Sequence, residues 1–450
     1  MNSSRCARLL ACLCLLALGG CGSWHYTINA QLAQHDPAHG YRFTNVDNGD
    51  NSDELFVVLT FSGGGMRASA LAYTVLERLA AERIAWKGRE MRLLDEVDLI
   101  YAVSGGSMTA AYYALHGDGL FRDFDARFFG RDLQDQIQSR IVSLSAIPRL
   151  LAPRYGRVDM VQEFLDETLY DKKTFADLPR RRPFVLISAS DIGTGSRFEF
   201  TQGTFDLLCS DLDKFPIARA VAASSALPLV FSPVTLWNYA GSCGLPPVPY
   251  LPDAQGVLAA RQAQRLRELT SYLDRTRRPY IHLLDGGLAD NIGVRGLIET
   301  AALVGGLDVA LKLTDVETVR KLVIVTVNAE TDSDRTVDLT ADVPSLSQVM
   351  RALVDVPINR YSYETEVIGR QSIEAWHRHR TQIGQPVDLY LVEVGLKDVA
   401  DPTEREFLNT VPTTLQLPKE TVERIRRAGS HLLDESKEFQ RLLRSLRAIP

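Results

Sequence analysis

The stretch YAVSGGSMTA, residues 101–110, places a serine where a nucleophilic hydroxyl would need to be. Ser104 follows an apolar run and precedes a stretch of helical character, and a tight turn between the two would expose its hydroxyl group. The residues from Ala102 to Gly106 read Ala-Val-Ser-Gly-Gly. They match the nucleophile elbow G-x-S-x-G except for the methyl group of Ala102. Ser104 is therefore our candidate nucleophile, with an ordinary loop serine as the alternative.

Asp285 is the candidate for the base that a nucleophilic serine requires. It ends the apolar run YIHLL and precedes two glycines. A carboxylate at the carboxyl edge of a parallel sheet lies where α/β proteins commonly build their sites. The alternative is an aspartate that only caps a turn.

The eight histidines offer a different base, but none lies in an obvious base context. We expect His282, inside an apolar strand, to be packed in the core, and His377 and His379 to lie on a solvated helix face. A histidine-dependent esterase therefore stays open as an alternative, although no residue marks its histidine.

The glycine-rich stretch TFSGGGMRAS could stabilise negative charge. Gly63, Gly64 and Gly65 follow an apolar run and precede a helical stretch, so their backbone N–H groups would line a concave loop that binds an anion. We expect this loop to form an oxyanion hole for a tetrahedral intermediate. Arg67 would fix the loop or add positive potential. The alternative is a dinucleotide loop, because Gly63, Gly65 and Ala68 also fit G-x-G-x-x-A.

Strands must deliver these groups to one place, and six apolar runs are expected to form them. Helical stretches lie between most of the runs, which predicts an α/β protein with a three-layer α/β/α fold and a mostly parallel central sheet. The last forty residues have the pattern of one or two amphipathic helices. No linker composition divides the chain, so we expect one catalytic domain over 55–450. The predicted strands are 55–61, 97–103, 184–191, 280–287, 321–330 and 387–394.

The first 20 residues have the composition of a secretory signal peptide. Arg5 and Arg8 precede ten apolar residues, which are too few to span a bilayer. The stretch LGGC, residues 18–21, also resembles the bacterial lipobox, which implies cleavage before Cys21 and a diacylglycerol on its sulfur. Since Gly22 follows, the same pattern implies sorting to the outer membrane. We therefore expect a lipid-anchored protein of the bacterial cell envelope, with residues 21–54 as a polar tether.

Charge and cysteine content narrow the possible partners. The 450-residue chain has a formal net charge of −6, and loss of the two arginines of the signal would make it −8. No basic cluster supports nucleic-acid binding. Beyond Cys21, only Cys209 and Cys243 remain, and an oxidising envelope would permit a disulfide between them, with two buried thiols as the alternative. Neither lies in a metal-ligand pattern, so we expect no metal.

Three motifs in this order resemble those of the patatin-like phospholipase family, which are G-G-G-x-R, G-x-S-x-G and D-G-[GA]. Here they run from Gly63 to Arg67, from Ala102 to Gly106 and from Asp285 to Gly287. The stretches SASDIGTGSRFEF, AVAASSALPLVFSPV and VPTTLQLP resemble further segments of the family. The likeness spans about residues 55–430.

The resemblance implies a Ser104–Asp285 dyad without a histidine, which would hydrolyse acyl esters of phospholipids or related lipids without calcium or another cofactor. Partial burial would raise the pKa of Asp285 and help it to accept the proton of Ser104. The apolar stretch 141–151 and the Gly- and Pro-rich loop 238–256 would line an acyl groove or touch a membrane. The alternative is a noncatalytic envelope lipoprotein that keeps the fold to bind a lipid or a partner.

Overall fold

The computed structural model of the chain describes residues 24–86, 89–247, 257–313, 318–332 and 336–447. The main sheet has the strand order β10-β9-β1-β4-β5-β8-β7, and β6 pairs with β5 beside this path. All six predicted runs form strands of this sheet. The strands are β1 (Leu55–Phe61), β4 (Val97–Val103), β5 (Phe184–Asp191), β6 (Ser196–Glu199), β7 (Val234–Trp237), β8 (Tyr280–Leu284), β9 (Lys321–Asn328) and β10 (Asp388–Gly395), and β2 (Arg83–Trp86) and β3 (Arg89–Arg92) form a separate ribbon.

The sheet is parallel from β10 through β5, and only its other edge is antiparallel. All seven residues of β1 are buried, which is typical of a parallel strand covered on both faces. The prediction of a mostly parallel sheet is therefore confirmed. The strands β6 and β8 both run antiparallel to β5, and Asp285 directly follows β8.

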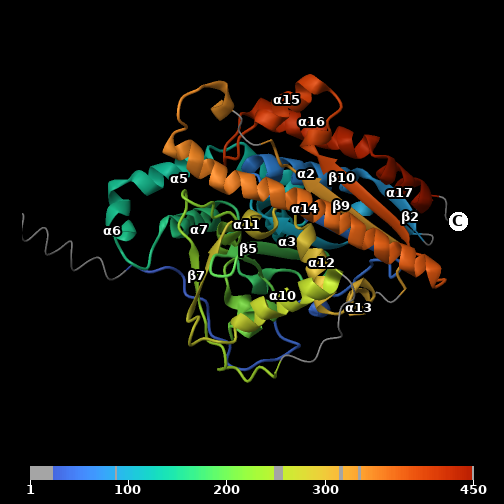
Figure 1. The fold of residues 1–450 in the computed structure, drawn as a ribbon, viewed down its shortest axis with the longest axis horizontal. Coiled ribbons are helices and arrows are strands. Elements are labelled where there is room, and N and C mark those ends of the chain that lie inside the picture. Colours follow the sequence, from blue (N-terminus) through green and yellow to red (C-terminus); the bar gives the residue numbers. More distant parts are fainter. Residues whose placement is uncertain (1–23, 87–88, 248–256, 314–317, 333–335, 448–450) are drawn as a thin grey trace, which may run out of the picture.

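Helices connect most of the strands and cover the sheet (Figure 1). Among the described residues, no helix is both long and apolar enough to cross a bilayer. The helices used below are α2 (Gly65–Ala81), α3 (Gly105–His116), α5 (Leu133–Val142), α6 (Ile147–Leu150), α7 (Arg157–Thr168), α9 (Ile217–Ser224), α10 (Val257–Ser271), α11 (Gly287–Asp290), α12 (Val294–Leu303), α13 (Leu307–Lys312), α14 (Leu346–Gln382), α15 (Pro402–Thr410), α16 (Lys419–Glu435) and α17 (Lys437–Arg447).

Two hydrophobic clusters on opposite faces of the sheet make the fold three-layered. Val57 of β1 belongs to the larger cluster, together with Leu76 of α2 and Ile425 of α16. Its neighbour Val58 points to the other face and packs in a second cluster with Ile373 of α14, the long helix that crosses the front of the sheet in Figure 1. The period of two along a strand separates these side chains. The three-layer α/β/α prediction is confirmed, and the C-terminal helix α16 is part of the same core.

Residues 24–54 have little regular secondary structure, but they are not a free tether. Asn29 and Tyr41 are buried, and the Tyr41 hydroxyl accepts a hydrogen bond of 2.8 Å from the backbone N–H of Val185 on β5. The predicted tether is therefore wrong for this segment, because its aromatic and amide side chains complete the core. Residues 1–23, which contain the predicted signal peptide and Cys21, lie outside the described residues.

The Gly- and Pro-rich loop after β7 is fixed by a disulfide between Cys209 and Cys243, whose Cα atoms are 5.4 Å apart. The backbone oxygen of Cys243 also accepts a hydrogen bond of 2.8 Å from the N–H of His35 in the N-terminal segment. The described part of the loop, 238–247, therefore packs on that segment. Residues 248–256 lie outside the described residues.

Candidate active site

Ser104 lies in the turn between β4 and α3, with backbone angles φ of 48° and ψ of −120°. A positive φ is uncommon for a residue with a side chain, and such strain is concentrated at functional turns. Glycines make the turn possible: a Cβ on Gly105 would lie 2.0 Å from the backbone oxygen of Gly65, and one on Gly106 would lie 2.7 Å from that of Ser62. Ala102 is fully buried in β4, where the sheet accommodates its methyl group. The turn thus holds the serine directly against the glycine loop.

The Ser104 hydroxyl donates a hydrogen bond of 2.8 Å to Oδ2 of Asp285, which is 181 positions away in the sequence. The expectation that a parallel strand would deliver this carboxylate is wrong, because β8 runs antiparallel to β5. β4 and β8 both pair with β5, ending at Ser188 and Ser190 respectively. Two strands that run in opposite directions therefore end at the same level, and this register brings the hydroxyl and the carboxylate together.

The Asp285 carboxylate is buried, with only 6% of the residue exposed. Its Oδ1 accepts a hydrogen bond of 2.8 Å from the backbone N–H of Gly287, and no cationic side chain among the described residues pairs with it. Burial raises the pKa of Asp285 to about 6, against the opposing effect of the hydrogen bonds from Gly287 and Ser104. A Cβ on Gly286 would lie 2.3 Å from the backbone oxygen of Ser188, so this glycine allows the carboxylate to come close to β5.

Ser224 supports the serine turn, and the sequence reasoning did not single it out. Its hydroxyl accepts a hydrogen bond of 2.8 Å from the backbone N–H of Ser104 and donates one of 2.6 Å to the backbone oxygen of Ser188. Its own backbone oxygen accepts from the N–H of Gly286 at 3.0 Å. Ser224 ends α9 inside AVAASSALPLVFSPV, so the resemblance marked the segment but gave no role to this residue.

The glycine loop lies beside Ser104, since a Cβ on Gly63 would be 3.3 Å from the Ser104 Cβ. The N–H of Gly63 donates to the backbone oxygen of Asn291 at 3.0 Å, which corrects its expected role as an oxyanion donor. The N–H groups of Gly64 and Gly65 have no hydrogen-bond acceptor among the described residues. Both residues have positive φ, 134° and 59°, a backbone conformation that favours glycine. Two backbone donors therefore remain available next to the hydroxyl.

A glycine is needed at position 65 because two backbone segments of the chain pack closely there. A Cβ there would lie 2.3 Å from the backbone oxygen of Thr414, and that oxygen accepts a hydrogen bond of 2.7 Å from the N–H of Met66. Thr414 belongs to VPTTLQLP, the late stretch noted in the sequence. The approach of a pyrophosphate is not needed to explain this glycine, so the dinucleotide alternative has no support here.

Arg67 is buried and holds the glycine loop in place. Its Nε donates 2.7 Å to the backbone oxygen of Ala329, and its guanidinium also donates to the backbone oxygen of Val411 and to Oγ1 of Thr413. Burial lowers the pKa of Arg67 to about 10. Of the two roles expected for this arginine, its contacts support the fixing of the loop.

No histidine of the described chain forms a hydrogen bond or an ion pair with Ser104 or Asp285. His282 was expected in the core and is instead exposed, because the alternation of β8 buries its neighbours Ile281 and Leu283. Its Nδ1 lies 3.0 Å from Oγ1 of Thr235. The geometry thus gives the serine a carboxylate partner and no imidazole.

One set of potential metal ligands occurs among the described residues: His39, Asp211 and Asp213. Asp211 already pairs with Lys214 at 3.1 Å and Asp213 with Arg180 at 2.7 Å. These cations compensate the carboxylates, so the cluster can be explained as a surface ion-pair network.

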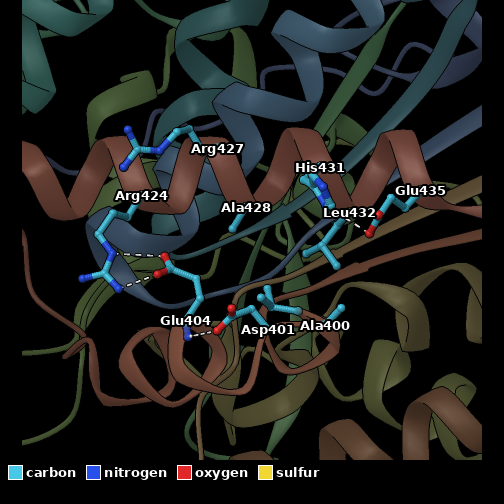
Figure 2. Close-up of a pocket in the computed structure, with 10 residues that line it drawn as sticks. Ala400, Asp401, Glu404, Arg424, Arg427, Ala428, His431, Leu432 and Glu435 are labelled. Atoms are coloured by element: carbon cyan, nitrogen blue, oxygen red, sulfur yellow. Dashed lines mark hydrogen bonds and ion pairs between the residues drawn. The ribbon is translucent and has the colours of Figure 1, made fainter.

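A separate cavity of about 290 Å³ lies between α15 and α16 (Figure 2). Charged side chains line it, and two pairs of them are in contact: Arg424 with Glu404, and His431 with Glu435 at 3.0 Å. None of its lining residues is a predicted site residue. The cavity therefore does not belong to the serine site.

Comparison with solved structures gives weak likenesses. Human GIVD cytosolic phospholipase A2 is 13% identical with a TM-score of 0.44, over 88% of this chain and 62% of that one. Its complex with methyl gamma-linolenyl fluorophosphonate is 14% identical with a TM-score of 0.42, over 88% and 59%. VipD from Legionella pneumophila is 12% identical with a TM-score of 0.28, over 93% and 71%. The chain thus spans about three fifths of the length of the phospholipase A2 chains.

The sequence comparisons are more decisive. No curated protein sequence matches the chain significantly. A family model described as patatin-like phospholipase matches residues 59–298, which is more than half of the chain. The matched span includes the glycine loop, Ser104 and Asp285. The chain therefore belongs to the patatin-like phospholipase family.

Proposed function

We propose that the chain is a serine acyl hydrolase that cleaves ester bonds of phospholipids or related lipids. The observation that carries this proposal is the hydrogen bond of 2.8 Å from the Ser104 hydroxyl to the buried carboxylate of Asp285. The strained turn between strand and helix supports a nucleophile at this position. Membership of the family supports a lipid ester as the substrate.

In the proposed reaction, Ser104 Oγ attacks the ester carbonyl carbon while Asp285 accepts the hydroxyl proton. The N–H groups of Gly64 and Gly65 stabilise the negative oxygen of the tetrahedral intermediate. The intermediate then expels the alcohol, which takes the proton from Asp285, and the acyl group remains on Ser104. Water attacks this acyl-enzyme as Asp285 accepts its proton. The fatty acid leaves, and the proton returns to Oγ.

The raised pKa of Asp285 suits this role. A carboxylate with a pKa of about 6 is a stronger base than an exposed one and is still ionised at neutral pH. A neighbouring cation would lower the pKa and weaken the base, and none of the described residues provides one.

A test removes each partner and measures hydrolysis of a phospholipid and of a soluble ester. Ser104→Ala and Asp285→Asn should each abolish turnover of both substrates without lowering the thermal transition. Ser225→Ala is the matched control, because its hydroxyl lies one residue from Ser224 and has no hydrogen-bond partner among the described residues. It should keep full activity. Turnover that survives in Ser104→Ala would refute the proposal, and wild-type protein that binds lipid without hydrolysis would favour a binding protein.

We further propose that a lipid on Cys21 anchors the chain in the outer membrane of the bacterial envelope. The sequence LGGC after a short apolar run supports this attachment. Cells labelled with radioactive palmitate should yield labelled protein in the membrane fraction. Cys21→Ala should remove the label, and an unlabelled wild-type protein would contradict the anchor.

A further inference from the structure

The first turns of α14 expose apolar side chains on the surface of the protein. No residue of this helix is fully buried before Ser362. Leu346, Val349 and Leu353 are nevertheless apolar and exposed by 76%, 43% and 64%. Their spacing of three and four residues puts them on one stripe of the helix. Residues 343–354 include one arginine and no acidic residue.

A second exposed apolar segment lies in α5 and the short turns up to α7. Val142, Leu144 and Leu151 are exposed by 78%, 85% and 66%. Figure 1 shows α5, α6 and the start of α14 together at the left end of the molecule. Two segments that are about two hundred residues apart thus expose leucine and valine at one end, although burial of such side chains is strongly favoured.

The helices that carry these exposed residues also contact elements beside the serine site. The side chain of Gln134, in α5, accepts a hydrogen bond of 3.2 Å from the N–H of Leu415, next to the Thr414 that covers the glycine loop. On the other side, α14 packs against α11, which begins two residues after Asp285. The helices α5 and α14, which carry exposed apolar residues, therefore both contact elements next to the catalytic groups.

The charge around the second segment favours an anionic partner. Residues 136–157 include four arginines and no acidic residue, in a chain whose net charge is −6. Arg140 and Arg149 pair with glutamates of α7. Arg154 and Arg157 are exposed and have no carboxylate partner among the described residues.

Trp24, the first residue that the structure describes, lies against the second exposed segment. The Trp24 ring packs against Tyr155, with ring centroids 6.4 Å apart, and Arg149 lies over it at 4.9 Å. Cys21 precedes Trp24 by three positions in the sequence, so a lipid on Cys21 would be attached within about 11 Å of Trp24 along the chain. An anchor at that point would direct the flanking apolar side chains toward the same membrane.

We propose that these side chains form a docking face that inserts into an anionic lipid bilayer and delivers ester substrate to Ser104. The inference rests on the proposed lipid substrate. Insertion of apolar side chains with arginines at the headgroup level is the physical basis of interfacial binding. The docking face consists of Val142, Leu144, Leu151, Leu346, Val349 and Leu353.

The test measures sedimentation with vesicles, using the chain from Gly22 onward, since all described contacts lie within residues 24–447. The chain should carry Ser104→Ala, so that binding is measured without hydrolysis. Vesicles of phosphatidylcholine with phosphatidylglycerol should bind more protein than phosphatidylcholine alone. The double change Leu144→Gln and Leu353→Gln should weaken partitioning on the order of tenfold to a hundredfold. Glutamine keeps the helix propensity of leucine.

The matched control changes exposed apolar residues elsewhere. Leu313 and Ile383 are exposed by 54% and 49% and follow the ends of α13 and α14. Their double change to glutamine should leave vesicle binding unchanged. With Ser104 intact, the Leu144 and Leu353 variant should hydrolyse a soluble short-chain ester at the wild-type rate and lose activity only on vesicles.

Several outcomes would overturn the docking face. The first is unchanged vesicle binding in the Leu144 and Leu353 variant, and the second is an equal loss of binding in the control variant. The third is a wild-type protein that forms a dimer and does not bind vesicles, if the Leu144 and Leu353 changes dissociate that dimer. Failure of the proposed function is distinguishable, because a chain that binds vesicles through this face but hydrolyses no ester would refute only the chemistry.

Discussion

Asp98, at the amino end of β4, and Asp285, beside its carboxyl end, are both buried, and burial raises the pKa of each to about 6. Their partners differ. Asp98 forms an ion pair with Arg182 and accepts a hydrogen bond of 2.7 Å from the N–H of Val57. Asp285 has only a hydroxyl and one backbone N–H.

The comparison shows that a raised pKa alone does not identify a catalytic carboxylate. Arg182, whose side chain is only 2% exposed, fixes Asp98 as a structural charge, because separation of the pair would leave a buried cation. Asp285 faces a proton that it can accept, on a hydroxyl held at a strained turn. The geometry and the partners of the two carboxylates, together with the pKa, therefore distinguish Asp285 from Asp98.

The largest expected effects come from Asp285→Asn and Asp98→Asn. Loss of the base should lower kcat on a soluble ester by about 10⁴-fold. Asp98→Asn should leave the kcat of folded protein within a few-fold of wild type, because Asp98 lies at the opposite end of β4 from Ser104. Its effect should fall on the free energy of unfolding, because the variant removes the charge that faces the buried Arg182. Ester hydrolysis and urea unfolding of both variants would test this contrast.

Asp285→Asn should be more stable than wild type at pH 8. The folded pKa of Asp285 is above its unfolded value, so as pH rises from about 4 to 6 the unfolded chain releases the proton first and the folded state loses stability. Asp285→Asn should therefore unfold at a higher urea concentration than wild type at pH 8, with the difference gone below pH 4. An Asp285→Asn variant that unfolds at the same or a lower urea concentration than wild type at pH 8 would contradict this prediction.

Gly105→Ala, in the turn that holds Ser104, should cause the next largest loss of kcat. The new Cβ would lie 2.0 Å from the backbone oxygen and 2.6 Å from the nitrogen of Gly65, so the glycine loop must shift. Displacement of its N–H donors should lower kcat by about 10²- to 10³-fold. Gly195→Ala is the control: its φ is 70° and a Cβ would meet no atom within 4 Å. It should cost about 1 kcal/mol of stability and no activity.

The pH profile should report Asp285 and not Asp98. The carboxylate must be ionised to accept the proton, so kcat should rise up to a pH of about 6 and then level off, with a value at pH 4 about a hundredfold below the plateau. The Asp98→Asn variant should keep this acid limb. A wild-type profile that is flat between pH 4 and 7, or a limb that disappears in Asp98→Asn, would assign the titration to another group.

Ser224→Ala should have the smallest effect. It leaves the buried N–H of Ser104 without its acceptor, which should lower the free energy of unfolding by about 1–3 kcal/mol. The turn would hold its geometry less firmly, so kcat should fall about tenfold with KM unchanged. Steady-state kinetics beside Ser225→Ala would check this, and equal behaviour of the two variants would deny Ser224 a positioning role.

The parts of the fold with a local signal were predictable from the sequence. Parallel strands buried on both faces appear as continuous apolar runs, and the small residues around Ser104 indicate a crowded turn. The direction of β8 had no such signal, since a short run such as YIHLL is compatible with either strand direction. His282 was misplaced for a related reason, because the strand lies where alternate side chains reach solvent.

Long-range contacts account for most of what the sequence did not reveal. Residues 24–54 are polar and irregular, yet Tyr41 fixes them through a hydrogen bond to β5. The hydroxyl of Ser224 accepts a hydrogen bond from Ser104, and the N–H of Gly63 donates one to Asn291, and both partners are far away in the sequence. Such contacts have no periodicity and no motif spacing, so only the three-dimensional arrangement shows them.

The most direct measurement is covalent labelling of the native protein by an alkyl fluorophosphonate, followed by mass spectrometry of its peptides. If the carboxylate activates the hydroxyl, Ser104 Oγ should displace fluoride and form one phosphonyl ester, on Ser104. The label should be absent in Ser104→Ala, greatly slowed in Asp285→Asn and unchanged in Asp98→Asn. An unlabelled wild-type protein, or a label that persists in Ser104→Ala, would contradict the account.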